Sequence, residues 1–185
     1  GDSATYAVPY ARGGQAVPLA LKHSTERIEA LGNDALIVGN AGNDLVFSSV
    51  RLDAKATPVS GYIQRNEVQS ESRPHGLLYE PQGEANGILG LPILGGSEER
   101  PSAAVKYLRN KKLQLSDLGL LVASPGKVRD DGCQVSCVDW YGNARPIFIG
   151  GRVYALMGYE LVEGRIVDDA LVELRRVNYA PGQRR

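Results

Sequence analysis

The chain has few of the residues that carry most enzyme chemistry: its 185 residues include two histidines, two cysteines, one tryptophan and one methionine. Because His23 and His75 are the only imidazoles, any histidine-assisted nucleophilic mechanism must use one of these two positions. Neither lies in a recognisable nucleophile motif, and Gly1-Asp2-Ser3 lacks the strand and turn that hold a lipase-type serine. We therefore predict no catalytic residue and no cofactor, with both histidines bonded to neighbouring backbone; His23 and His75 become the catalytic candidates only if the protein is an enzyme.

The chain also lacks net charge and long apolar runs. Lysine plus arginine and aspartate plus glutamate number 21 each, so no long-range field gathers nucleic acid or an anionic membrane, and we expect neither as a partner. The longest apolar runs, such as 118–123 and 147–149, are far shorter than the roughly 18 residues of a membrane-spanning helix. The start at Gly1, without an initiating methionine or a signal segment, suggests a processed or trimmed chain.

The two cysteines, Cys133 and Cys137, are close enough in sequence to suggest a local disulfide in an oxidising compartment. On an extended strand their Cα atoms would lie roughly 13 Å apart, so the bridge requires a loop or a helical turn. The alternative is two buried thiols. A zinc site would need His23 and His75 as further ligands, which are distant in sequence and lie in different predicted units, and we predict no metal.

Turn residues are abundant, with 22 glycines and 10 prolines set between short apolar segments, which is typical of all-β proteins. Residues 30–39 and 148–158 each read as a strand, a glycine-containing turn and a second strand. A third strand comes after each unit, at 45–52 and at 171–177. Recurrence of such a meander at long spacing indicates a β-repeat architecture.

The pattern of apolar segments predicts three sheets. The first covers residues 27–64, with strands expected at 27–31, 35–38, 45–52 and 59–64 and a proline-marked outer strand at 17–21. The second covers 74–123, with strands at 76–80 and 87–94, a hairpin of 103–108 and 113–115 joined by 109–112, and a buried inner strand at 118–123. Helix is the competing prediction for 103–113. The third covers 134–179, with strands at 134–140, 144–149, 152–162 and 171–179, and turns at Gly150-Gly151 and Asp168-Asp169.

Consecutive sheets of about 40 to 50 residues, each with an apolar inner strand, are typical of propeller blades. We predict an all-β fold of antiparallel four-stranded β-propeller blades, about three to four in number, with residues 1–26 as a closing or linking strand. Closed propellers use about 4 to 8 blades, so we expect the ring to be incomplete in this chain. A β-sandwich and an irregular antiparallel barrel are the alternatives.

Four segments carry a resemblance to a known group. They are residues 23–35, 72–79, 90–93, and 137–148 continuing into 152–161. Together they resemble the C-terminal half of bacterial secreted or lipid-anchored β-propeller proteins, over most of the chain from about residue 20 to about residue 180. The resemblance implies a propeller fold and an exported location, which is extracellular, periplasmic or on the outer-membrane surface. It leaves the activity open, because structural repeats carry no catalytic signature.

These observations favour a non-enzymatic secreted propeller segment that acts as a binding or assembly scaffold. Another chain, or another part of the same precursor, would complete it and cover its open blade. One alternative is a propeller-type hydrolase or lyase with a central-channel active site. Another is a carbohydrate- or surface-binding module that uses Trp140, Tyr141 and Arg145 as contact residues, although a single tryptophan also serves as a core or inter-blade anchor.

Overall fold

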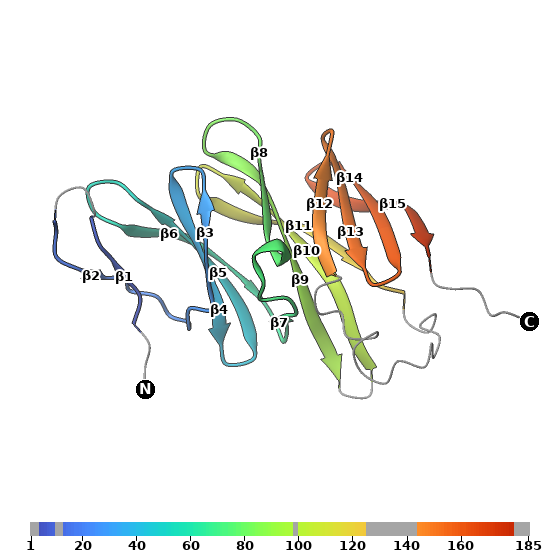
Figure 1. Cartoon of the computed structure of the whole chain (residues 1–185), viewed down its shortest axis with the longest axis horizontal. Coiled ribbons are helices and arrows are strands. Elements are labelled where there is room, and N and C mark those ends of the chain that lie inside the picture. The colour runs from blue at the N-terminus through green and yellow to red at the C-terminus, as the bar shows by residue number, and fades with distance from the viewer. Residues whose placement is uncertain (1–3, 10–12, 98–99, 125–143, 180–185) are drawn as a thin grey trace, which may run out of the picture. The chain divides into compact units, whose positions relative to one another are not determined.

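Strands joined by short turns account for almost all of the secondary structure (Figure 1). The structure, a computed structural model, describes residues 4–9, 13–97, 100–124 and 144–179. Within these residues the single helical element is a 3-10 turn, η2 (Pro74–Gly76). The prediction of an all-β fold of antiparallel sheets is confirmed, and the helix considered for 103–113 is wrong, since these residues belong to a strand and its turn.

The chain divides into two compact units, and each is described by itself. The N-terminal unit comprises residues 1–68, 81–88 and 109–116, and the C-terminal unit comprises residues 69–80, 89–108 and 117–185.

The first meander sheet lies in the N-terminal unit. Its strands pair in chain order: β3 (Arg27–Leu31), β4 (Asp34–Ala41), β5 (Asp44–Arg51) and β6 (Thr57–Gln64). All three pairs are antiparallel, and the β3–β4 turn uses Gly32 at φ 66°. These strands confirm the four-stranded sheet predicted over 27–64.

The central strands of this sheet are buried on both faces. Leu36, Ile37 and Phe47 are at most 1% exposed. Leu19 and Leu21 pack against one face, over Ile37 and its neighbours. The outer strand predicted at 17–21 is shorter than expected: β2 (Val17–Pro18) pairs with β1 (Tyr6–Ala7), and Leu19 and Leu21 contribute to the core instead.

The segment before β3 lies against β4 through a close backbone approach. Ser24 N donates to Asn40 O over 2.9 Å, and Asn40 N donates to Ser24 Oγ over 2.8 Å. A Cβ atom on Gly39 would lie 1.8 Å from Ser24 O, so only glycine permits this approach. The approach fixes His23 beside β5.

A second sheet contains strands of very different length. They are β7 (Val68–Gln69), β8 (Leu78–Pro81), β9 (Asn86–Ser97), β10 (Arg100–Lys111) and β11 (Gln114–Val122). The order is β11-β10-β9-β7, and β8 also pairs with β9.

Two expectations for this sheet are wrong. The β10–β11 turn lies at Lys112-Leu113 rather than at 109–112, so residues 113–115 and 118–123 are not separate strands. Residues 118–122 instead belong to β11, at one end of the strand order rather than inside it. Only Leu118 and Leu121 of this apolar run are buried, which is the pattern of a strand that packs through part of one face.

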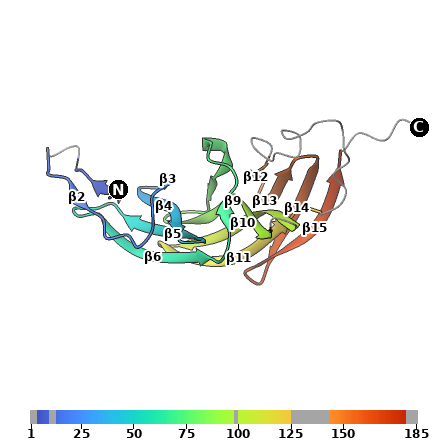
Figure 2. The same ribbon diagram turned by 90° about the horizontal axis from the view of Figure 1, so that it is seen from below.

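The second meander sheet lies in the C-terminal unit (Figure 2). Its strands also pair in chain order: β12 (Ala144–Ile149), β13 (Arg152–Met157), β14 (Glu160–Val167) and β15 (Ala170–Asn178). The turns at Gly150-Gly151 and Asp168-Asp169 are confirmed. The single strand expected over 152–162 is wrong, because Gly158 at φ 58° turns the chain between β13 and β14.

As a consequence, the segment 171–177 is the fourth strand of its meander and not the third. Each of the two meander sheets thus has four strands in sequential order. The strand expected at 134–140 lies outside the described residues.

The core of the C-terminal unit is organised around the ring of Tyr107. The ring meets Phe148 edge to face, with centroids 6.1 Å apart, and its hydroxyl donates to Tyr154 O over 2.5 Å. Burial raises the pKa of Tyr107 well above its usual value. A Cβ atom on Gly90 would lie 2.9 Å from this ring and 2.4 Å from Pro146, so β9 passes the ring without a side chain.

Candidate functional site

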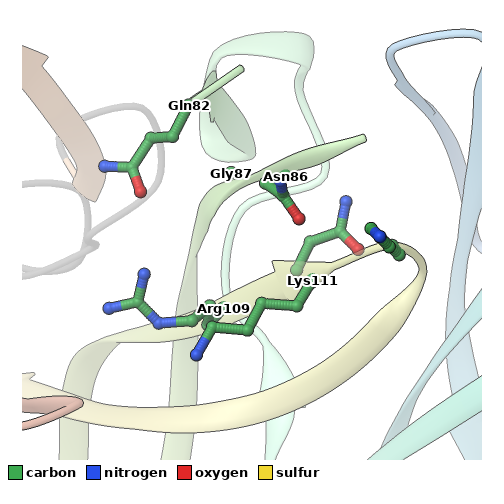
Figure 3. Close-up of a pocket in the computed structure, with 7 residues that line it drawn as sticks. Gln82, Asn86, Gly87, Arg109 and Lys111 are labelled. Atoms are coloured by element: carbon green, nitrogen blue, oxygen red, sulfur yellow. The ribbon is translucent and has the colours of Figure 1, made fainter. Parts of the chain in front are cut away.

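A pocket in the N-terminal unit is the candidate site (Figure 3). Its volume is about 490 Å³, within the range of roughly 300 to 1,000 Å³ that is usual for small-molecule sites. It is lined by Gln82, Asn86, Gly87, Arg109, Asn110, Lys111 and Lys112. The lining comes from two places: the start of β9 with the turn before it, and the end of β10 with the turn after it.

The turn before β9 is closed by the backbone. Gln82 N donates to Asn86 O over 2.8 Å, and Gly83 and Ala85 take left-handed conformations with φ of 93° and 56°. Ala85 O in turn accepts from Lys112 N over 2.8 Å. This bond ties the turn before β9 to the turn after β10, and it brings the two halves of the lining together.

The turn after β10 has an unusual composition. Lys112 and Leu113 have φ of 51° and 70°, so both central residues of this two-residue hairpin turn are left-handed, a geometry that normally favours Asn-Gly. Asn110 Oδ1 accepts from Leu113 N over 2.9 Å, and the Leu113 side chain is buried. Burial and hydrogen bonds therefore hold a turn that its sequence alone would disfavour.

Strand geometry then distributes the charges. Successive side chains of a strand point to opposite faces, so Arg109 and Lys111 share one face of β10 while the buried Asn110 faces the other way. Figure 3 shows the head groups of Gln82, Arg109 and Lys111 extending toward the same side of the view. Together with Lys112, the pocket presents three cationic side chains, although the chain has no net charge.

Among the residues that the structure describes, the lining includes no carboxylate, imidazole, hydroxyl or thiol side chain. Lysine and arginine side chains carry a positive charge near neutral pH. Such a lining can hold an anion by charge and hydrogen bonds, and it offers no pair of groups for general acid–base work.

Sequence reasoning missed this pocket, because the run 109–112 reads as the connection of a hairpin. One signal was present: cations at 109 and 111 have the spacing that places them on one face of a strand. The partner residues Gln82 and Asn86 had no signal, since only the fold brings them to the end of β10.

His23 is bonded to the sheet in the N-terminal unit and does not line the pocket. Its Nδ1 lies 2.6 Å from Ser24 O and its Nε2 lies 2.8 Å from Ser48 Oγ. A carbonyl oxygen only accepts, so Nδ1 carries the proton, and in the neutral ring Nε2 accepts from the Ser48 hydroxyl. The contact with Ser24 O is the backbone bond expected from the sequence, and the contact with Ser48 was not foreseen.

His75 lies in the C-terminal unit, beside a buried carboxylate. Its Nε2 is 3.5 Å from Oε2 of Glu71, a residue that is 1% exposed. Glu71 Oε1 accepts from Arg73 N over 2.8 Å and from Arg73 Nε over 3.0 Å. The carboxylate thus holds η2 and the residues before it, which is a structural role, and His75 does not line the pocket.

Two further buried carboxylates in the C-terminal unit are neutralised by arginines. Glu163 accepts from Arg152 Nε over 2.8 Å and from Arg175 over 3.2 Å, and the hydrogen bond to Glu163 raises the pKa of Arg152. Glu160 Oε2 accepts from Arg176 over 2.7 Å. The two carboxylates are buried, whereas Arg152 and Arg175 remain more than half exposed.

Of the predicted contact residues, Arg145 is exposed on β12, opposite Leu156 in the strand register. Trp140 and Tyr141 lie outside the described residues, as do Cys133 and Cys137. Their contact surface and their disulfide stay predictions.

Comparison with protein-family models, with curated proteins and with solved structures gave no match in any of the three. Within the described residues, no helix has the length and apolar character needed to cross a membrane. Over the same residues, no group of three or more histidine, cysteine, aspartate or glutamate side chains is placed to hold a metal ion.

Proposed function

We propose that this chain is a binding segment of a secreted bacterial β-propeller protein, and that it holds an anionic ligand in the pocket at the ends of β9 and β10. The observation that carries the proposal is the lining, which combines three cations with amides among the described residues. Opposite charge and hydrogen bonds to charged groups supply affinity for an anion.

The propeller assignment is supported by the two four-stranded meander sheets, each with its strands in chain order. Blades of a propeller have this topology. The resemblance to secreted and lipid-anchored propeller proteins supports an exported location, which we propose is extracellular, periplasmic or at the outer-membrane surface.

A partner is supported by the surface of β15. This strand stands at the end of its sheet among the described residues, and it exposes Val172 by 52% and Leu174 by 51%. Exposed apolar side chains on an end strand favour pairing with another polypeptide. We propose that another chain, or the remaining blades of the same precursor, covers this strand and completes the ring.

A hydrolase is the second candidate, and the contact of His23 with Ser48 is the observation that favours it. A serine whose hydroxyl donates to an oriented imidazole resembles an activated nucleophile. A fluorophosphonate probe tests it directly: labelling of Ser48 that disappears in His23→Ala would support the hydrolase.

The binding proposal is tested by titration calorimetry with small anions at low and at physiological ionic strength. Arg109→Gln, Lys111→Gln and Lys112→Gln are combined in one variant, and Lys22→Gln, Arg51→Gln and Lys55→Gln in a matched control, because these three exposed cations of the same unit lie outside the pocket. Binding should weaken with salt and be lost in the pocket variant alone. If both variants lose affinity equally, the binding depends on net charge and not on the pocket. If a chemically altered ligand is recovered, the protein is an enzyme.

A further inference from the structure

The size of the pocket restricts the ligand, given the anion binding proposed above as the function of this site. A volume of about 490 Å³ lies well inside the range of roughly 300 to 1,000 Å³ that small organic ligands occupy. A bare inorganic anion would fill only a small part of this space. The volume therefore suits an organic molecule that carries an anionic group.

The lining also restricts the body of that molecule. Of the lining residues in the described part of the chain, Gly87 alone lacks a polar side chain, and none is aromatic. An apolar body would leave the amides of Gln82 and Asn86 without water and without hydrogen bonds, which costs free energy. Each amide offers both a donor and an acceptor, so a body rich in hydroxyl groups satisfies them.

The two kinds of group are separated in the lining. The cations Arg109, Lys111 and Lys112 come from the end of β10 and its turn, together with Asn110, whose amide oxygen already accepts from Leu113 N. The other two amides, Gln82 and Asn86, come from the start of β9 and the turn before it. A ligand that fits this arrangement carries its charge at one end and its hydroxyls along the rest. The planar fork of arginine matches both carboxylate and phosphate groups.

From this separation we infer that the pocket binds an anionic saccharide. Its carboxylate or phosphate group contacts Arg109 and Lys111, and its hydroxyls contact Gln82 and Asn86. A uronate sugar and a sugar phosphate share this chemistry, and the two are separate arms of the test.

The test is calorimetry on the full chain at one ionic strength with five probes: a hexuronate disaccharide, a hexose phosphate, the neutral disaccharide, inorganic phosphate and a short glutamate peptide. One of the two anionic saccharides should bind at least about tenfold more tightly than the last three probes. Gln82→Ala and Asn86→Ala should weaken that saccharide about three- to tenfold and change the affinity for inorganic phosphate by less than about twofold.

Three results would overturn the inference. If the neutral disaccharide binds as tightly as the anionic one, charge does not contribute to the affinity. If inorganic phosphate or the peptide binds as tightly as the anionic saccharide, the hydroxyl groups do not contribute to affinity. The proposed anion binding would still hold. If none of the charged probes binds the correctly folded chain, the proposed function fails together with the inference.

Discussion

Ser60 Oγ donates to Leu113 O over 2.6 Å and accepts from Leu115 N over 3.1 Å, so one hydroxyl of β6 fixes the chain on both sides of Gln114. Ser49 Oγ donates to the same carbonyl oxygen over 2.6 Å. Two serines of the first meander sheet thus fix the left-handed turn that carries Lys112. The sheet and the turn both belong to the N-terminal unit.

We expect Ser60→Ala to lower the free energy of unfolding by about 1 to 3 kcal/mol, because Leu115 N loses this acceptor and Leu113 O keeps Ser49 but loses its second hydroxyl donor. The matched control is Ser116→Ala, an exposed serine of β11, which should stay within about 0.5 kcal/mol of the parent. Urea titration of the variants measures both. Equal stability of the two variants would contradict the importance of this hydroxyl.

The buried phenol of Tyr107 makes stability depend on alkaline pH. Its pKa is raised by burial, so above about pH 10 the unfolded chain loses this proton while the folded chain keeps it. Unfolding is then favoured as the pH rises, and stability is lost from about pH 10 toward the raised pKa.

Tyr107→Phe separates this contribution from the other tyrosines. Near pH 8 the variant should be less stable by about 1 to 3 kcal/mol, since Tyr154 O loses its donor. Above about pH 10 the difference should shrink, because only the parent carries the buried phenol. Urea titrations of both proteins across this pH range measure it, and a difference that stays constant would show that Tyr107 ionises normally.

The two histidines should be dispensable for the binding that we propose. Neither lines the pocket, so His23→Ala and His75→Ala should leave the affinity of the pocket unchanged within about twofold. His23→Ala should still lower stability, since it removes contacts with Ser24 and Ser48. Ester, glycoside and peptide substrates should show no turnover that depends on either residue. If the parent shows such a turnover and a folded double variant loses it, the hydrolase or lyase hypothesis would be favoured over the binding one.

The disulfide between Cys133 and Cys137 remains a prediction from the sequence. A bridge over so short a loop should stabilise the chain at the low end of about 2 to 4 kcal/mol. Thiol labelling of the denatured, unreduced chain counts the reactive cysteines. None is expected, and two per chain would remove the disulfide and weaken the proposed export.

The sequence predicted strands best where a glycine and an alternating pattern agree, as at Gly32 between β3 and β4 and at Gly150-Gly151 between β12 and β13. It failed at Lys112-Leu113, where the turn depends on hydroxyls from β5 and β6 and on the burial of one leucine. Local composition contains no trace of those long-range bonds.

The candidate site was harder to predict for the same reason. The cations at 109–112 are visible in the sequence, but their meaning depends on Gln82 and Asn86, which the fold brings to them. The contact of His23 with Ser48 likewise joins residues 25 positions apart and depends on the absence of a side chain at Gly39.

The tight turn at Lys112-Leu113 also bears on how the protein meets proteases. Lys111 and Lys112 are exposed, and trypsin cleaves after such residues, yet a protease needs several residues in an extended, accessible form. A two-residue hairpin turn fastened by Asn110 and by two serines does not offer them. Cleavage after these lysines would therefore require the hairpin to open first, and its rate would report how often the pocket at the ends of β9 and β10 opens in the native protein.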